Sequence, residues 1–379
     1  MTVVDAETLV LDNDTGSQSL PTGSTDLEVD IRTVLLRLET DDGHTGLGAS
    51  FHHAASLTDT FALAKSVEAL AEHVVGEDAD PVRGHWHELY DTVKRSTAFE
   101  ALSVVDQALW DVKGKRADLP LYQLLGGTTG DLRAYATFPH AKAAEELVAD
   151  AEWLADAGFE MLKIVAGFGP REDRERIEAV APTLPADFGL AIDANTSYDF
   201  GDALAVARTA SEHDLRWFEE PIAHTDVRGI ADLRSRVSVP IAGYQTQTPH
   251  YPAVDHLRED AYDVYQPSLY HVGGVTAAMN VATLVEAFNK TMVPHAVGPA
   301  VNYAASLHVA AAAPACSLVE FAVFDDEADD PREFVASPYV ANQDELSVSP
   351  DGTISPPERP GLGVILDEDA VEEYRVEER

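Results

Sequence analysis

A chain of 379 residues with 45% hydrophobic side chains is long enough to build one large domain and a smaller one around buried cores. Its formal net charge of −40 excludes nucleic acids and anionic membrane surfaces as partners, because charges of the same sign repel. A single cysteine, Cys316, excludes an internal disulfide.

The acidic side chains are spread along the chain and not gathered in a tail, a distribution typical of halophilic proteins that work in a salt-rich cytoplasm. The first residues, MTVVDAETLVLD, lack the basic and apolar stretches of a signal peptide. No segment reaches the ~20 apolar residues that a membrane span needs. We therefore expect a soluble, cytoplasmic protein.

The first 50 residues alternate apolar and polar side chains, a pattern that predicts antiparallel strands. Residues 11–26, between two of these strands, are rich in Gly, Ser, Thr and Asp and are expected to form a loop, either a connector or a lid. From about residue 58 to 117 apolar residues recur every three or four positions, which predicts helices. An antiparallel sheet followed by helices indicates an α+β domain over residues 1–125.

From residue 126 onwards, short strand-like runs alternate with Ala-rich helical segments. Seven of these runs end in a polar or charged residue, and successive endings are 23 to 30 residues apart, about the length of a strand, a helix and two loops. The endings are Lys163, Asp193, Glu219, Gln245, Ser268, His295 and Glu320. The pattern predicts a βα barrel over residues 126–322, with polar side chains at the C-terminal ends of its strands. Residues 323–379 are expected to return to the first domain.

Several stretches resemble the mandelate racemase and muconate-lactonizing branch of the enolase superfamily. ALSVVDQALWDVKGKRADLPLYQLLGG is similar to the family's domain junction, AIDAN and WFEEP to its first two metal-ligand strands, and DGTISPPERPGLGVILDE to its C-terminal return. The resemblance covers nearly the whole chain and implies an α/β fold. This fold is a modified (β/α)7β TIM barrel under an N-terminal capping domain that the C-terminal segment completes. The resemblance also implies a homo-oligomer, either a dimer or an octamer. It further implies a divalent cation, usually Mg²⁺, that binds a substrate carboxylate.

The resemblance places the metal ligands at three successive strand ends, Asp193, Glu219 and Gln245. Mg²⁺ prefers hard oxygen ligands, and the first two side chains supply carboxylates. At the third position the family usually has another carboxylate, whereas this chain has an amide. The carbonyl oxygen of Gln245 can still ligate Mg²⁺, with weaker affinity as the expected result. The alternative is that this strand end no longer binds metal.

The catalytic candidates implied by the resemblance are Lys163, His295 and Glu320. A second lysine that serves the family as a base is replaced by Val165, and an Asp that pairs with the family's His is replaced by Ser268. A serine can orient an imidazole, but it cannot stabilise an imidazolium as a carboxylate does. Glu320 matches a Glu that donates a hydrogen bond to the substrate carboxylate, for which it must be protonated.

Further substrate-contacting candidates lie near these strand ends or on a loop of the first domain. Asn195 matches a substrate-contacting position of the family, and three neighbours offer a replacement acid or base. Two histidines of the first domain face the barrel mouth by the same resemblance, although ordinary loop histidines are the alternative. These five candidates are Tyr244, Gln247, His271, His52 and His53.

We predict a Mg²⁺-dependent enzyme that removes the proton α to the carboxylate of a small hydroxy acid and eliminates water, of the acid-sugar dehydratase type. Cycloisomerase, succinylbenzoate synthase and dipeptide epimerase activities need lysines on both faces, and no lysine lies between Lys163 and Lys290. Two alternatives stay open. One is a family member that binds metal or ligand without turnover, and the other is a racemase or epimerase with an unusual second base such as His271.

Overall fold

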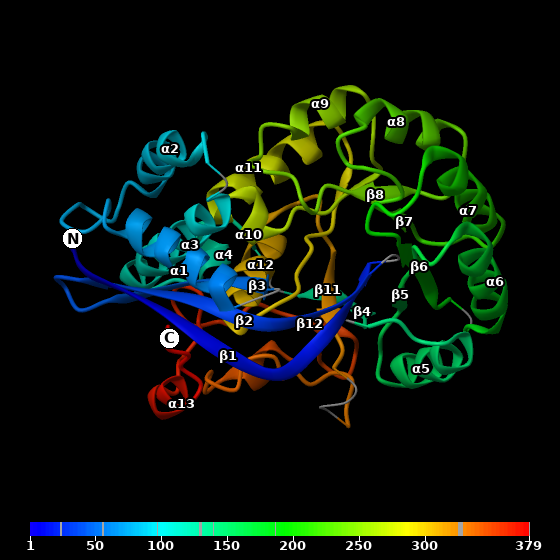
Figure 1. Ribbon diagram of the computed structural model, residues 1–379. Helices are drawn as coiled ribbons and strands as arrows, with labels where there is room; N and C mark the ends of the chain where they lie inside the picture. Colours follow the sequence, from blue (N-terminus) through cyan, green and yellow to red (C-terminus); the bar gives the residue numbers. More distant parts are fainter. Residues whose placement is uncertain are drawn as a thin grey trace.

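A computed structural model describes residues 1–22, 25–54, 57–96, 98–128, 131–138, 140–185, 187–324 and 329–378. The side chains of 14–30 and 51–58 lie outside this description. No helix within these ranges combines the length and the apolar character that a membrane crossing requires. In Figure 1 a smaller domain, which contains the N-terminus, lies beside a larger ring of strands and helices.

The first domain is a three-stranded antiparallel sheet covered by helices. Its elements are β1 (Val3–Thr22), β2 (Thr25–Thr40), β3 (Thr45–Ala54), α1 (Leu57–Ala71), α2 (Val82–Val93) and α3 (Phe99–Ala117), followed by the short α4 (Leu121–Leu124). The predicted loop at residues 11–26 is wrong as a loop. Among the described residues of this stretch, β1 runs to Thr22 and β2 begins at Thr25, with Ser17 opposite Asp30 and Thr22 opposite Thr25, after a register shift beyond Asp12.

Helix α3 lies directly against strand β3, and glycines make this approach possible. A Cβ atom on Gly48 would lie 1.9 Å from the carbonyl oxygen of Val104, and one on Gly46 would lie 2.2 Å from that of Ala108. Both distances are far shorter than any van der Waals contact, so only glycine fits. Helix and sheet thereby share one buried core.

The larger domain is a curled parallel sheet of eight strands with helices outside it, in the strand order β10-β9-β8-β7-β6-β5-β4-β11. Its strands are β4 (Leu132–Thr137), β5 (Met161–Val165), β6 (Gly189–Asp193), β7 (Phe218–Glu219), β8 (Ile241–Gly243), β9 (Val264–Tyr265), β10 (Thr291–Met292) and β11 (Leu318–Ala322). Its helices are α5 (Ala144–Asp156), α6 (Pro170–Val180), α7 (Phe200–Glu212), α8 (Val227–Ser235), α9 (Ala253–Arg258), α10 (Leu269–Val272), α11 (Gly274–Ala287) and α12 (Ala300–Ala312). Short 3₁₀ helices span Ala181–Thr183 and Gln343–Leu346.

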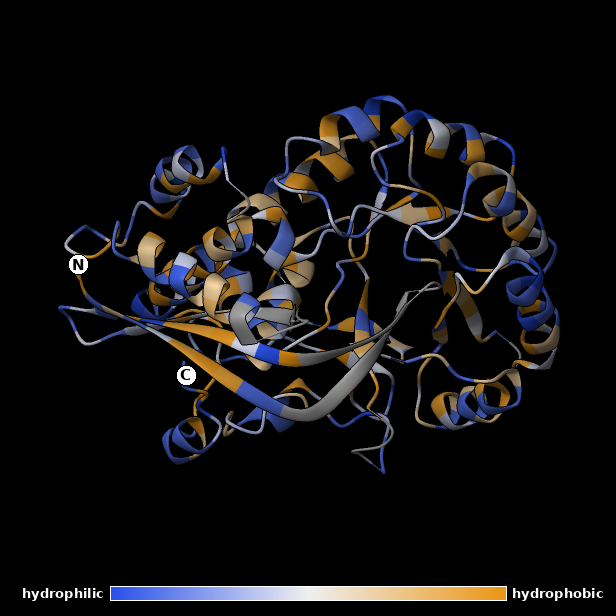
Figure 2. Cartoon of the chain, in the orientation of Figure 1, coloured by the Kyte–Doolittle hydropathy of each residue, from blue (hydrophilic) through white to orange (hydrophobic). Residues whose placement is uncertain are grey.

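Helices α6, α7 and α8 are amphipathic, with hydrophilic and hydrophobic residues following one another along their ribbons in Figure 2. Their buried positions recur at helical spacing, as in α7, where Ala203, Val206, Ala207 and Ala210 are buried. One apolar face of such a helix can therefore cover the sheet while charged residues face solvent. Helix α12 differs, because it is buried at nearly all of its positions. The arrangement confirms the predicted α/β fold, a (β/α)7β barrel with an N-terminal capping domain.

The C-terminal segment contacts both domains. Strand β12 (Thr353–Ile354) pairs antiparallel with β4 of the barrel. The segment then returns to the first domain, where the amide of Asp12 donates to the carbonyl of Tyr374, just after α13 (Glu368–Glu373). In the described residues the C-terminal segment thus ties the barrel to the capping sheet.

A buried carboxyl group joins the capping helix α3 to the barrel helix α11. Asp106 accepts hydrogen bonds from the amide of Thr276 at 2.9 Å and from its hydroxyl at 2.6 Å. Trp110, one turn further along α3, donates its indole N–H to the same hydroxyl at 2.8 Å. Burial raises the pKa of Asp106 to about 7, because desolvation outweighs the hydrogen bonds that stabilise the charged form.

Candidate active site

The site is built on a layer of apolar side chains inside the barrel. One buried cluster gathers one residue from each of seven strands or strand ends, with Leu318 of β11 packed against it: Tyr135, Met161, Ala191, Trp217, Ala242, Val264 and Val293. Alternate residues of a strand lie on the same face. The residues two positions further along therefore also face the interior, and on all of these strands except β8 they are polar: Thr137, Lys163, Asp193, Glu219, Gln266, His295 and Glu320.

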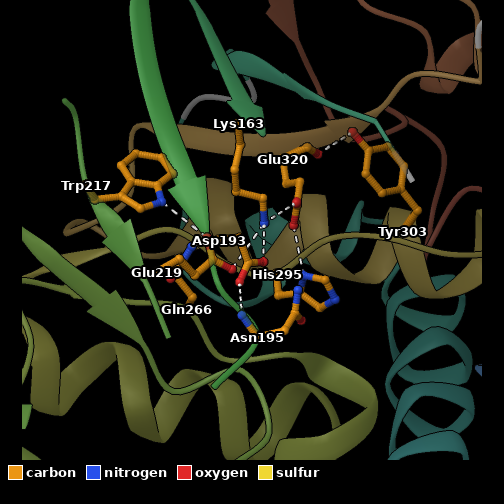
Figure 3. A network of polar contacts seen from close by, with 9 residues as sticks. All are labelled: Lys163, Asp193, Asn195, Trp217, Glu219, Gln266, His295, Tyr303 and Glu320. Carbon is orange, nitrogen blue, oxygen red and sulfur yellow. Dashed lines mark hydrogen bonds and ion pairs between the residues drawn. The ribbon is translucent and has the colours of Figure 1, made fainter. Parts of the chain in front are cut away.

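Lys163 lies at the centre of this polar layer, as Figure 3 shows. Its ammonium nitrogen is 3.4 Å from Oδ2 of Asp193, 3.1 Å from Oε1 of Glu219 and 2.8 Å from Oε1 of Glu320. All four side chains are buried. One ammonium is therefore shared by three carboxyl groups that approach it from different strands.

The carboxyl groups of Asp193 and Glu219 each direct one oxygen to Lys163, while neutral donors hold the other oxygen. The backbone N–H of Asn195 donates to Oδ1 of Asp193 at 2.9 Å. Trp217 and Gln266 donate to Oε2 of Glu219 at 3.1 and 2.7 Å. Oδ2 of Asp193 and Oε1 of Glu219 thus face a common point, which the ammonium group of Lys163 occupies.

Negative charge exceeds positive charge around this point. Burial raises the pKa of Asp193 to about 8, and the neighbouring Glu219 adds to the shift. Burial raises the pKa of Glu220 to about 8 as well, with further contributions from Asp193 and Glu219. The pKa of Lys163 is raised despite its burial, because the surrounding carboxylates stabilise the ammonium. Such a cluster favours an additional cation.

His295 is paired with Glu320 across the line where the barrel closes. Strands β10 and β11 are the two ends of the strand order, and Nδ1 of His295, just beyond β10, lies 2.9 Å from Oε2 of Glu320 on β11. Burial alone would raise the pKa of Glu320, but Lys163 and His295 outweigh it and lower this pKa to about 2. A carboxylate between two donors is stabilised in its charged form, whereas the expected donation of a hydrogen bond to the substrate needs the protonated form of Glu320.

The third expected metal ligand follows a break in the strand pattern at β8. Tyr244 has a left-handed backbone (φ 93°), and its ring packs against His256 and Tyr265, with its hydroxyl 3.3 Å from the carbonyl of His250. Tyr244 is thus engaged in packing and is not placed with the polar layer. The next residue, Gln245, has a buried Oε1 with no hydrogen-bond partner among the described residues.

These donors fit a divalent metal ion with a neutral third ligand. Within the described residues no group of three His, Cys, Asp or Glu side chains is arranged to hold a metal. Two carboxylate oxygens facing one point and an unpartnered amide oxygen just beyond the end of the neighbouring strand β8 are hard ligands, which suit Mg²⁺. Gln245 therefore remains the candidate for the third position.

The other predicted residues lie around this core to different degrees. Asn195 follows β6 with a left-handed backbone (φ 44°) beside Asp193, and Gln247 is buried, with an unpartnered Nε2. His271 lies in α10, where its Nδ1 is 3.6 Å from Oε1 of Glu100 on the capping helix α3. His52 and His53 belong to β3 by their backbones, while their side chains lie outside the described residues.

Three residues of the site were missed by sequence reasoning. Gln266 and Trp217 hold Glu219, and Glu220 is buried with a left-handed backbone (φ 40°) and an unpartnered Oε1. The signal for Gln266 was present, because it is the first polar residue after a short apolar strand. The interpretation placed that strand's ending two residues later, at Ser268.

Comparison with known proteins agrees with this geometry. Residues 146–370 match the family model of the enolase C-terminal domain-like fold, and residues 18–126 match that of the mandelate racemase/muconate lactonizing enzyme N-terminal domain. The chain belongs to the mandelate racemase/muconate lactonizing enzyme family of the enolase superfamily.

The names of relatives in this family describe enzymes that act on sugar acids and their cyclic forms. The chain is 29% identical to arabinonate dehydratase of Saccharolobus solfataricus, over 90% of each chain. It is 32% identical to D-galactarolactone cycloisomerase of Agrobacterium fabrum, over 90% of this chain and 91% of the relative. A racemase structure from Streptomyces coelicolor with bound magnesium aligns with a TM-score of 0.84 and 28% identity, covering 99% and 100% of the two chains. Magnesium is therefore the metal that this family context supports.

Proposed function

We propose that the protein is a Mg²⁺-dependent lyase that removes the proton α to the carboxylate of a small hydroxy acid and eliminates water, as an acid-sugar dehydratase does. The observation that carries the proposal is the convergence of Asp193, Glu219 and Lys163 on one point. A buried histidine, His295, lies on the other side of Glu320. Dehydratases of sugar acids among the relatives support the reaction type.

Asp193, Glu219 and Gln245 are the residues that would hold the metal. When bound, Mg²⁺ supplies a Lewis acid that stabilises the negative charge gathering on the substrate carboxylate. Lys163 is the residue that would donate hydrogen bonds to the same carboxylate, because its ammonium already lies among the ligands.

His295 is the proposed acid and base. Its Nε2 takes the proton from C2 of the substrate, a double bond forms between C2 and C3, and the bond from C3 to its hydroxyl oxygen breaks. The imidazolium returns the proton to the departing hydroxyl, which leaves as water, and the enol product becomes a 2-keto-3-deoxy acid. One histidine serves both steps when the proton and the hydroxyl leave from the same face.

The surroundings favour elimination over racemisation, which needs a base on each face of the substrate. Val165 stands where the family has its second lysine, and Lys163 is held as an ammonium by three carboxyl groups. His271 follows β9, which neighbours the β10 strand that leads to His295, so His271 lies on the same side of the barrel. Among the side chains that the structure describes, this arrangement gives no support to an opposed pair of bases.

A second candidate function is the opening of a cyclic sugar acid, in which the oxygen that leaves C3 belongs to a ring. The cycloisomerase relatives at 32% and 31% identity favour it. The positions of the lysines were used above to exclude cycloisomerase activity, and that exclusion was therefore too broad. Both reactions begin with the same proton removal by His295 and differ in whether water is lost.

A screen of acid sugars and their lactones with Mg²⁺ in concentrated KCl tests the proposal. We expect a 2-keto-3-deoxy acid lighter than its substrate by one water, detected with semicarbazide and by mass spectrometry. An isomeric product would indicate ring opening. Deuterium exchange at C2 in D₂O without loss of hydroxyl would support a racemase. The His295→Asn variant serves as the blank. If no substrate gives product or exchange above this blank, the result would support the alternative that the protein binds metal or ligand without turnover.

A further inference from the structure

We infer that Glu320 is the positioning residue for His295, in the role that the family gives to a residue one strand earlier, where this chain has Ser268. The geometry of the pair stands independently of the reaction, but its importance for turnover rests on the proposed function. This role differs from the expected one, in which Glu320 donates a hydrogen bond to the substrate.

The contacts of Glu320 fix the direction of the hydrogen bond to His295. Oε1 accepts from the ammonium of Lys163 at 2.8 Å, and Oε2 lies 2.9 Å from Nδ1 of His295. A carboxylate only accepts hydrogen bonds, so Nδ1 carries the proton in this pair. The tyrosine hydroxyl of Tyr303 donates to the backbone carbonyl of Glu320 at 3.1 Å and so helps to hold the strand beneath the pair.

Ser268 lies beside His295 but does not hold its ring. The two residues form an isolated parallel bridge between their backbones. The hydroxyl of Ser268 is buried, and the hydrogen bond of the His295 ring among the described residues goes to Glu320. The orienting group therefore comes from the strand after His295 and not from the strand before it.

This pairing leaves Nε2 of the neutral ring as the basic nitrogen. A proton on Nδ1 means a lone pair on Nε2, which is the arrangement that a general base needs. The same carboxylate also binds Lys163, which lies on β5, next to β4 in the strand order. Glu320 thus connects the acid and base group with the cation that the substrate carboxylate would meet.

The test compares the ring tautomer of His295 in the unmodified protein and in Glu320→Gln by ¹⁵N NMR, with the resonances assigned from the His295→Asn spectrum. We expect the neutral ring to carry its proton on Nδ1 in the unmodified protein. In Glu320→Gln, the ammonium of Lys163 donates to the side-chain amide oxygen of the new glutamine. The NH₂ group of that glutamine then faces Nδ1 of His295 and donates to it, so the ring proton moves to Nε2. The proposed activity then falls by about 10⁴-fold in kcat, as for amide variants of other histidine–carboxylate pairs.

Two further variants separate positioning from a merely structural effect. Ser268→Asp in the Glu320→Gln background supplies a carboxylate from the neighbouring strand, and we expect it to return the proton to Nδ1. Ser268→Ala alone is expected to leave the tautomer unchanged. A proton on Nε2 in the unmodified protein, which can be measured even if Glu320→Gln fails to fold, would overturn the inference. An unshifted tautomer in Glu320→Gln would overturn it too.

The tautomer distinguishes this inference from the proposed function. If the tautomers shift as expected while no sugar acid is converted, the positioning role of Glu320 stands and the proposed function fails. If a sugar acid is dehydrated while Glu320→Gln leaves the tautomer unchanged, the function stands and the positioning role is wrong.

Discussion

The ammonium of Lys163 lies where Asp193 and Glu219 direct their free carboxylate oxygens. A metal ion bound by the same two oxygens must compete with it, because two cations cannot share that point at low cost in a buried site. Lys163 therefore acts as a resident counter-ion that keeps the carboxylates stable without metal. Binding of Mg²⁺ is an exchange of cations as much as an addition of one.

Lys163→Met is expected to bind Mg²⁺ at least ~10-fold more tightly than the unmodified protein, a difference of about 1.4 kcal/mol or more. The reason is that no ammonium has to be displaced and the remaining carboxylates lack a counter-ion. Isothermal titration calorimetry measures the affinity, and Trp217 offers a fluorescence signal because its indole N–H contacts Glu219. Without metal the variant is expected to melt at a lower temperature.

The matched control is Lys290→Met. Lys290 also lies between two carboxylates, with its ammonium 2.5 Å from Asp260 and 3.8 Å from Asp263, but it precedes β10 at the opposite end of the barrel. The Lys290→Met substitution is expected to leave the Mg²⁺ affinity unchanged. Equal or weaker Mg²⁺ binding in Lys163→Met would show that the ammonium and the metal do not compete.

The junction of helices α3 and α11 is expected to give the protein a pH-dependent stability through Asp106. Its pKa is about 7 in the folded protein, against an ordinary value of 3.8. A raised carboxyl pKa means that the unfolded chain releases this proton first. The contribution of Asp106 to the free energy of unfolding therefore falls as the pH rises from about 4 to 7 and is constant above that window. The change is on the order of 4 kcal/mol at most.

Asp106→Asn isolates this contribution, because the amide cannot titrate and its oxygen can still accept from the backbone of Thr276. Urea unfolding at fixed KCl, from pH 4 to pH 8, gives the free energies of both proteins. We expect the unmodified protein to lose stability relative to the variant across this window. Two curves that stay parallel would contradict the assignment of a protonated Asp106 to the folded state.

At the level of elements, the sequence predicted the barrel and most of its polar strand ends, because spacing and alternation are local properties. It could not predict where alternation fails. The left-handed backbone at Tyr244 removes a large side chain from the expected position, and nothing in the neighbouring residues signals it. Nor did spacing reveal the pair of His295 and Glu320, since that contact depends on which side chains of β10 and β11 approach each other where the two ends of the strand order meet.

On the scale of the whole molecule, the net charge of −40 is expected to make folding depend on salt. Self-repulsion destabilises a compact acidic chain, and salt shortens the range of that repulsion from ~10 Å at 0.1 M to ~3 Å at 1 M. The melting temperature should therefore rise with KCl between these concentrations. Differential scanning calorimetry measures the change, and a flat or falling curve would contradict the expected role of the surface charge.

Mg²⁺ is expected to stabilise the protein in a second way, at concentrations far too low to screen the surface. Binding at one site stabilises the folded state in proportion to the logarithm of the ligand concentration above its Kd. In 1 M KCl, where added ionic strength no longer matters, Mg²⁺ should still raise the melting temperature of the unmodified protein. Asp193→Asn should lose this increment while keeping the response to KCl. An equal Mg²⁺ increment in both proteins would mean that the ion acts on the acidic surface and not between Asp193 and Glu219.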